Sequence, residues 1–263
     1  MKIDVEIPEA FKKKYRTTYF DPRKIELSPP RYVAWVDIMG SSQLMRKSHV
    51  QSAIAIGHLS SVVLEAADYL KFSGNIYPLV DGAYVTTTER SDLQALLKYI
   101  FKLSAINFLI GNTKQPGDLR IIRGSIAFGQ VIEGGDICNS AKILKIYDVR
   151  YTNKVLLGAP LALAYAAESL AAPFGVWIDE TARQFAPNIP SARTIRWTNW
   201  PWWDYITGDS IVDDDCKDIE RMLAEKLEKY YSWCDRNYIS ILYDPIRLKD
   251  HRERARQYFE SWE

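Results

Sequence analysis

Residues 32–42 read YVAWVDIMGSS, and residues 77–85 read YPLVDGAYV. Each stretch places one aspartate, Asp37 or Asp81, next to a short apolar run and a polar turn. Apolar residues in runs of this length predict strands at 32–37, 75–80 and 83–88, with Asp81-Gly82 as the turn of a hairpin. Both carboxylates are therefore expected at strand ends, where a buried sheet meets water.

Helical and strand patterns alternate along the following residues. Apolar residues recur at helical spacing over 48–70, 92–110 and 158–172, and further strand patterns lie at 119–127, 130–133 and 175–178. Ser91 is expected to cap the second helix, and Gly111 to end it. The order strand, helix, strand, strand, helix, strand predicts an α+β fold with ferredoxin-like, split β-α-β topology. Such a sheet is expected to carry helices on one face and to leave the other face free.

The composition changes at both ends of this pattern. Residues 1–30 are polar and end in Ser-Pro-Pro, which predicts an N-terminal arm. Residues 191–263 contain a tryptophan cluster, Trp197, Trp200, Trp202 and Trp203, and two helical patterns at 214–234 and 247–262. We expect the tryptophans to dock added C-terminal helices onto the domain of residues 31–190. The alternative is that they form a dimer or partner surface.

Composition and charge exclude several classes of function. The 263 residues are 47% apolar and 25% charged, which suits one large domain or one domain with an appendage. A net charge of +1 gives no global attraction to nucleic acid or to an anionic membrane. Three cysteines and three histidines show neither a disulfide framework nor zinc-ligand spacing. The first residues lack the apolar core of a signal peptide, and residues 155–172 contain Gly158, Pro160 and Glu168. These features predict a cytoplasmic protein.

The two aspartates suggest a metal site. In a split β-α-β sheet, Asp37 and Asp81 would lie on adjacent strands, and two close carboxylates need either a divalent cation or a shifted pKa. Mn²⁺ or Mg²⁺ would bind one oxygen of each aspartate and the Ile38 carbonyl, with two ions per site. The amides of the turn Gly40-Ser41-Ser42 would face the outer phosphates of a nucleotide. The alternative is that each aspartate is an ordinary turn or cap residue.

These motifs resemble those of class III nucleotidyl cyclases. Residues 33–42 are similar to the first metal motif of that family, Val80-Asp81-Gly82 is similar to the second, and residues 123–129, RGSIAFG, resemble a later strand. The three matches occur in family order over residues 31–180. The resemblance implies a catalytic domain at 31–190, in which a ribose 3′-hydroxyl attacks the α-phosphate of a nucleoside triphosphate. Arg123 could reach a phosphate across a subunit interface, or it could pair with a surface carboxylate.

The departures from the family pattern are also informative. Ala162 and Ala166 occupy the places of the helical Asn and Arg of adenylate and guanylate cyclases, and Tyr77 occupies that of a purine-selecting Lys. In these features the chain resembles the pyrimidine cyclases of the Pycsar anti-phage system. That resemblance implies conversion of UTP, or CTP, to the 3′,5′-cyclic monophosphate and diphosphate. It also implies a homodimer with active sites at the interface, and a separate effector that senses the cyclic nucleotide. A purine cyclase and a non-catalytic scaffold are the alternatives.

Two further assignments concern the base and the transition state. Strand alternation places Trp35 on the side of Asp37, and Tyr77 on the side of Asp81, where large rings would favour a pyrimidine over a purine. Both rings could equally belong to the core. Lys142 or Lys145 could replace the missing arginine, although a solvated helical face is the simpler interpretation of that segment.

Overall fold

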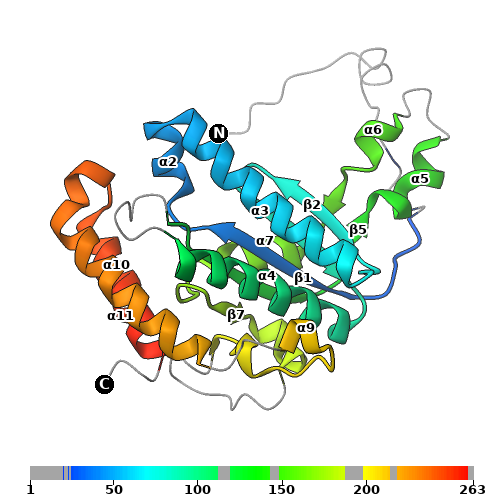
Figure 1. Ribbon diagram of the computed structural model, residues 1–263. Helices are drawn as coiled ribbons and strands as arrows, with labels where there is room; N and C mark the ends of the chain where they lie inside the picture. Colours follow the sequence, from blue (N-terminus) through cyan, green and yellow to red (C-terminus); the bar gives the residue numbers. More distant parts are fainter. Residues whose placement is uncertain are drawn as a thin grey trace, which may run out of the picture. The chain divides into compact units, whose positions relative to one another are not determined.

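The computed structural model describes residues 20, 23, 25–111, 119–142, 148–186, 198–213 and 218–259. The chain forms two compact units (Figure 1). The larger unit contains residues 30–129 and 158–263, and the smaller unit contains residues 1–29 and 130–157. All the candidate site residues named from the strands and the hairpin belong to the larger unit.

A five-stranded sheet in the order β2-β3-β1-β4-β7 forms the centre of the larger unit. Its strands are β1 (Arg31–Ile38), β2 (Asn75–Leu79), β3 (Gly82–Thr87), β4 (Ile122–Gly129) and β7 (Val176–Ile178). Neighbouring strands are antiparallel except for the parallel pair β4–β7. Because β3 lies between β1 and β2, this is the split β-α-β arrangement. The predicted α+β fold is confirmed.

Two long helices cover one face of this sheet. They are α3 (His49–Tyr69) and α4 (Arg90–Ile110), each of which follows a strand of the split unit. Ala34, Val36 and Ile38 of β1 point to this face and are buried in the main hydrophobic core. Their side chains share a face because strand residues two apart point the same way. The burial of this face against α3 and α4 is what fixes the register of β1.

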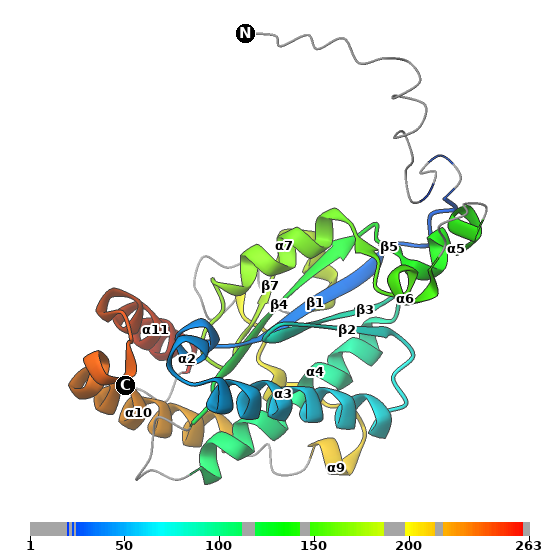
Figure 2. The same cartoon turned by 90° about the horizontal axis from the view of Figure 1, so that it is seen from above.

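The opposite face of the sheet carries a helix as well, which corrects the expectation of a free face. This helix, α7 (Ala159–Glu168), lies on the other side of the sheet from α3 and α4 (Figure 2). It packs over β1 and β4, and the buried Ala164 and Ala167 allow a close approach. The Tyr84 hydroxyl donates to the Leu161 carbonyl at 3.1 Å, and the Ser125 hydroxyl donates to the Ala164 carbonyl. The face that bears Asp37 is therefore partly covered.

The segment around Trp200 and Trp202 is buried within the larger unit. Trp200 and Trp202 are buried in the core, and the Trp202 indole N–H donates to the Phe174 carbonyl at 2.9 Å. The Tyr258 hydroxyl donates to the Trp200 carbonyl at 2.8 Å. The remaining described elements of this unit are α2 (Ser41–Lys47), η3 (Glu180–Phe185), η4 (Trp202–Asp204), α9 (Ser210–Asp213), α10 (Ile219–Ile241) and α11 (Pro245–Tyr258). Trp197 lies outside the described residues, and the domain boundaries drawn from composition stay a prediction.

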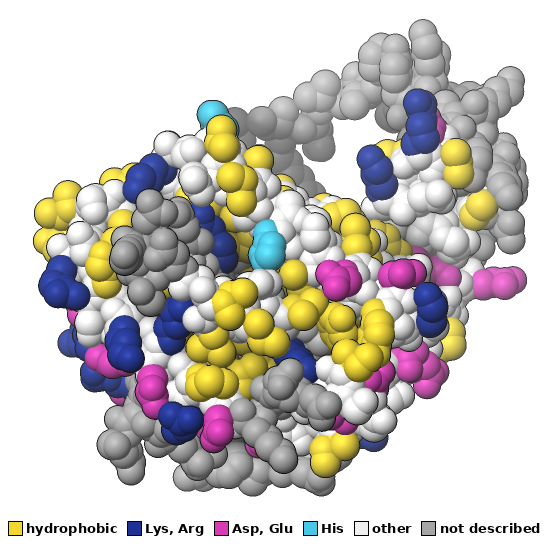
Figure 3. All heavy atoms as spheres, viewed as in Figure 1, with side chains coloured by type: hydrophobic (Ala, Val, Ile, Leu, Met, Phe, Trp, Pro, Cys, Tyr) yellow, Lys and Arg dark blue, Asp and Glu magenta, His cyan; other side chains and the backbone are white. Residues whose placement is uncertain are grey.

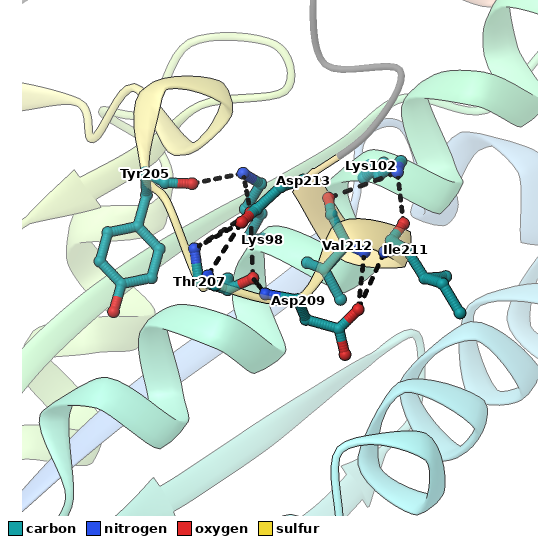
Figure 4. Close-up of polar contacts among 9 residues, drawn as sticks. Lys98, Lys102, Tyr205, Thr207, Asp209, Ile211, Val212 and Asp213 are labelled. Atoms are coloured by element: carbon teal, nitrogen blue, oxygen red, sulfur yellow. Dashed lines mark hydrogen bonds and ion pairs between the residues drawn. The ribbon is translucent and has the colours of Figure 1, made fainter.

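Two buried lysines of α4 fasten the segment around α9 (Figure 4). Lys98 forms an ion pair with Asp213 at 2.8 Å and also donates to the Tyr205 carbonyl. Lys102 donates to the Ile211 carbonyl at 2.7 Å. Asp213 also accepts hydrogen bonds from the Thr207 amide and hydroxyl, and its pKa is lowered mainly by the Lys98 hydrogen bond against the effect of burial. Buried lysines of this kind need such partners, because an unpaired buried charge is costly.

The smaller unit contains a two-stranded sheet and two short helices. Its elements are β5 (Ile132–Glu133), α5 (Gly134–Lys142), α6 (Val149–Thr152) and β6 (Leu156–Leu157), and β5 pairs antiparallel with β6. The Asp136 carboxylate accepts from the Glu133 amide at 2.7 Å and thereby caps the first turn of α5. The Lys142 side chain and all of Lys145 lie outside the described part of the chain, so that assignment stays a prediction.

Several element ends differ from the sequence prediction. Helix α4 begins at Arg90, after Glu89 rather than after Ser91, and no side chain caps its first turn. Gly111 ends the helix as predicted. Helices α3 and α4 are long and apolar enough to cross a membrane by length and composition. In the structure, both of them contribute buried residues to the core beside the sheet.

Candidate active site

Asp37 and Asp81 lie at the same end of the sheet. In the β-ladders the Cα partners of Asp37 are Gly82 of β3 and Arg123 of β4. Asp81 immediately precedes Gly82 at the tip of the β2–β3 hairpin. The Ser41 hydroxyl, four residues after Asp37, donates to the Asp81 carboxylate. Strand pairing and this hydrogen bond together bring the two acidic residues to one site.

The hairpin turn differs from the predicted one by one residue. Strand β2 ends at Leu79 and β3 begins at Gly82, so the loop is Val80-Asp81 rather than Asp81-Gly82. Gly82 is needed for a different reason, because a Cβ atom there would lie 2.5 Å from a ring carbon of Trp35. Val80 has a positive φ of 41°, which is strained for a β-branched residue. Such strain is found where the surrounding structure imposes a backbone position, here beside Asp81.

The carboxyl group of Asp37 is in an unfavourable environment for a charge. Burial is the main cause that raises its pKa to about 8, and the nearby carboxylates of Glu168 and Asp81 raise it further. The Ile38 amide and the Arg123 guanidinium oppose this shift without cancelling it. A divalent cation would reverse these effects, since it would favour the ionised form. Asp81 thus contributes to the raised pKa of Asp37, but less than burial and less than Glu168, which the sequence did not indicate.

Arg123 is paired within the chain. Its guanidinium donates to the Glu168 carboxylate at the end of α7, and the two side chains are only 14% and 9% exposed. Burial raises the pKa of Glu168, while Arg123 opposes the shift through charge and hydrogen bonding. Of the two roles considered for Arg123, the structure shows the pairing with a carboxylate, which is a buried one rather than a surface one. The pair also brings a third carboxylate close to Asp37.

An aromatic group lies beside Asp37 on the face covered by α7. The Trp35 ring centroid is 4.6 Å from that of Tyr84 and 5.7 Å from that of Tyr165. Trp35 is the Cα partner of Tyr84, which in turn pairs with the half-buried Tyr77 of β2. Directly opposed residues of antiparallel strands point to the same face. Trp35 and Tyr77 therefore share the α7 face, although Trp35 is well packed there, and their proposed role in base binding stays a prediction.

Two buried polar atoms on this face have no hydrogen-bond partner among the described residues. They are Asp37 Oδ1 and Trp35 Nε1, which belong to residues two apart on β1. Buried polar atoms are almost always satisfied, so each exception needs an explanation. One face of β1 thus presents a buried acceptor and a buried donor that a ligand could satisfy. The shifted pKa of Asp37 and the strained backbone of Val80 are also typical of a functional site.

The turn after β1 leads directly into α2. Gly40 has a φ of +77° and stands at the N-cap position of this helix without a side-chain cap. Ser41 is buried and bonds to Asp81, whereas the exposed Ser42 bonds to Gln43 at 3.0 Å. The structure thus ties Ser41 to the acidic pair, while the phosphate-facing role assigned to Gly40, Ser41 and Ser42 stays a prediction.

The described residues supply too few side chains to complete the coordination of a metal ion. No group of three or more His, Cys, Asp or Glu side chains among them is placed to hold a metal ion. The donor set nevertheless fits Mg²⁺ or Mn²⁺, because it consists of carboxylate oxygens, one of them buried and unsatisfied. Such ions commonly take the rest of their ligands from phosphates and water.

Sequence reasoning missed two residues of the site. Glu168 was seen only as a polar residue in an apolar helix, and Tyr165 was not singled out. Both lie on α7, whose position over β1 and β4 depends on contacts distant in sequence. A glutamate buried within an alanine-rich stretch was the only available signal, because a buried carboxylate requires a partner.

Comparison with known proteins finds similar folds in solved structures. No protein-family model matches the sequence, and no curated protein matches it. The guanylyl cyclase Cya2 aligns at a TM-score of 0.48 with 16% identity over 65% of this chain and 86% of its own. The guanylyl cyclase domain of the RhoGC fusion protein from Blastocladiella emersonii aligns at 0.46 with 14% identity over 62% and 88%. A bacterial light-regulated adenylyl cyclase aligns at 0.47 with 15% identity over 66% and 49%.

Proposed function

We propose that the protein is a metal-dependent nucleotidyl cyclase that acts on a pyrimidine nucleoside triphosphate, UTP or CTP. The products are the 3′,5′-cyclic monophosphate and diphosphate. The observation that supports this best is the meeting of Asp37 and Asp81 at one end of the sheet, with a buried Asp37 oxygen that has no partner among the described residues.

Three groups of the chain would hold the cations. We assign this role to the carboxylates of Asp37 and Asp81 and to the Ile38 carbonyl, with two Mn²⁺ or Mg²⁺ ions per site. When bound, the ions would lower the pKa of the attacking 3′-hydroxyl and stabilise the charge on the leaving diphosphate. Ser41 would orient Asp81, because its hydroxyl already donates to that carboxylate. The raised pKa of Asp37 means that cation binding competes with a proton near neutral pH.

The remaining residues would position the nucleotide. The amides of Gly40, Ser41 and Ser42 face the outer phosphates in this proposal, and the guanidinium of Arg123 binds a phosphate oxygen after exchange from Glu168. Since the cyclisation is intramolecular, holding the 3′-hydroxyl in line with the α-phosphate accounts for much of the rate. Arg123 and Glu168 are both largely buried, so the exchange would need the end of α7 to move.

The aromatic residues favour a small base. Trp35 supplies an indole N–H with no partner among the described residues, which could donate to a pyrimidine carbonyl. The rings of Tyr84 and Tyr165 pack against the Trp35 ring. Tyr77 lies on this face in place of a longer, charged lysine. Two-ring bases would require more space between Trp35 and α7 than one-ring bases.

The assembly and the biological role belong to the same proposal. Ala162 and Ala166 are exposed on α7, so no cation of this helix stands ready to stabilise the transition state. We propose a cytoplasmic homodimer with active sites at the interface, a separate effector that binds the cyclic nucleotide, and a role in anti-phage defence. These points are carried by the sequence resemblance.

The experiment is a product assay with matched variants. The purified protein is incubated with Mn²⁺ and each of the four nucleoside triphosphates, and cyclic products are identified by mass spectrometry. Cyclic UMP or CMP is expected, with loss of product in Asp37→Ala and retention in Asp68→Ala, whose side chain is 88% exposed on α3. Cyclic AMP or GMP alone would make the protein a purine cyclase, and the absence of any product would favour a scaffold.

A further inference from the structure

A cavity of about 470 Å³ lies on the face of the sheet opposite Asp37. Helices α3 and α4 form its walls, and its floor includes Ile38 of β1 and Ile122 of β4, which are Cα partners. A cavity of this volume is in the range of small-molecule sites. Most of its described lining is apolar, including Leu59 and Phe108. Figure 3 shows this face of the molecule, where hydrophobic side chains gather over α3 and α4.

One polar side chain of the described lining carries a permanent charge. Arg120 is the one side chain in the described lining that is ionised at all ordinary pH values, and that lining contains no aspartate or glutamate. Arg120 is half-buried and held in place, because it donates to the Leu119 carbonyl at 3.1 Å and to Gln51 Oε1 at 3.3 Å. Two other residues of the lining, Asn107 and His58, are joined by a hydrogen bond of 3.0 Å.

We propose that this cavity binds a small, largely apolar molecule that carries one anionic group, such as a medium-chain carboxylate. The apolar walls would enclose the hydrocarbon part, and Arg120 would bind the anion. An arginine fixed by neighbouring acceptors is suited to this role, since its planar guanidinium pairs with a carboxylate through two parallel hydrogen bonds.

The ligand would touch the residues next to the candidate active site. Ile38 follows Asp37 and Ile122 precedes Arg123, and neighbouring strand residues point to opposite faces. A molecule that presses on Ile38 and Ile122 thus acts one peptide away from Asp37 and Arg123. This regulatory part rests on the proposed function, whereas the binding itself does not. Occupancy is expected to change the turnover number rather than the KM for nucleotide if it shifts Asp37.

The binding test uses decanoate as the probe and decanamide as its uncharged match. Titration of the full-length protein by calorimetry should show saturable binding of one decanoate per chain. Arg120→Gln is expected to weaken decanoate at least about tenfold, as for the loss of a charge-assisted contact, and to leave decanamide unchanged. Ile54→Trp, on the 59% exposed rim, should block both probes, while Leu64→Trp, at a 60% exposed position of the same helix outside the cavity, should block neither.

Several outcomes would overturn the proposal. They are no saturable binding to the folded wild-type protein, equal binding of decanoate and decanamide, or decanoate binding that survives Arg120→Gln. Analytical ultracentrifugation of the same variants tests whether a second copy of the chain, rather than a small molecule, occupies this face. Self-association that is lost in Ile54→Trp but not in Leu64→Trp would assign this face to a second copy of the chain. Decanoate binding without any cyclase activity would leave the site intact and remove only its regulatory role.

Discussion

Replacing Asp37 by asparagine should stabilise the cation-free protein, and the gain should grow with pH. The folded protein raises the pKa of Asp37 from 3.8 to about 8, mainly through burial. Between these values the folded state holds a proton that the unfolded state has lost, so stability falls as pH rises. Asparagine keeps the shape of the side chain but has no proton to lose.

The size of the effect follows from proton linkage. A group protonated in the folded state alone changes the free energy of unfolding by about 1.4 kcal/mol per pH unit. Between pH 4 and pH 7 the advantage of Asp37→Asn over the wild type should therefore grow by on the order of 4 kcal/mol. Titrating groups that do not interact with Asp37 are common to both proteins and cancel in the difference, whereas Glu168 and Asp81 interact with Asp37 and contribute to the slope.

The assay is urea unfolding at pH 4, 5, 6, 7 and 8 in the presence of a chelator. Asp68→Asn, at a side chain that is 88% exposed on α3, serves as the matched control. Added Mn²⁺ should restore stability to the wild type at pH 8 and have no such effect on Asp37→Asn. Parallel pH profiles for the wild type and Asp37→Asn would refute the assignment of Asp37 as a buried carboxylate in need of a cation.

Three further predictions concern neighbouring groups. Lys98→Met should destabilise the protein by about 3 kcal/mol, because it leaves Asp213 without its buried cation, whereas Lys71→Met, at an 81% exposed side chain, should change the thermal midpoint little. Val80→Gly should raise stability by about 1 kcal/mol in urea unfolding, since it removes a positive-φ valine that is 76% exposed; a loss would show that the turn is unstrained. Glu168→Gln should move the pH midpoint of Mn²⁺ binding downward in calorimetry, because Glu168 helps to raise the pKa of Asp37; an unchanged midpoint would contradict the electrostatic coupling.

The parts of the fold that sequence could predict are those set by local pattern. Helix α3 was expected at 48–70 and lies at His49–Tyr69, and α4 ends at Gly111 as predicted. The convergence of Asp37 and Asp81 also followed from topology, since the split β-α-β order makes β1 and β3 neighbours. In each case the signal depends on residues close together in the chain, or on a strand order with few alternatives.

The parts that could not be predicted depend on contacts made by distant residues. Gly82 was assigned to a turn because Asp-Gly commonly forms one. In the structure its lack of a side chain leaves room for the Trp35 ring on the neighbouring strand. The position of α7 and the pairing of Glu168 with Arg123 likewise join residues 45 positions apart. Local propensity contains no information on which face of a sheet a helix will cover.

The candidate active site and the proposed ligand cavity include two successive cross-strand pairs of β1 and β4. Asp37 opposes Arg123 on one face, and the next residues in register, Ile38 and Ile122, oppose each other on the other face. Both isoleucines are almost fully buried, at 2% and 3% exposure, so neither can move without moving its strand. Any displacement of this ladder end changes the distances among Asp37, Arg123 and Glu168, on which the pKa of Asp37 depends. Binding of the proposed ligand on the α3–α4 face and protonation of Asp37 on the α7 face should therefore be thermodynamically linked. Each should alter the equilibrium constant of the other by the same factor.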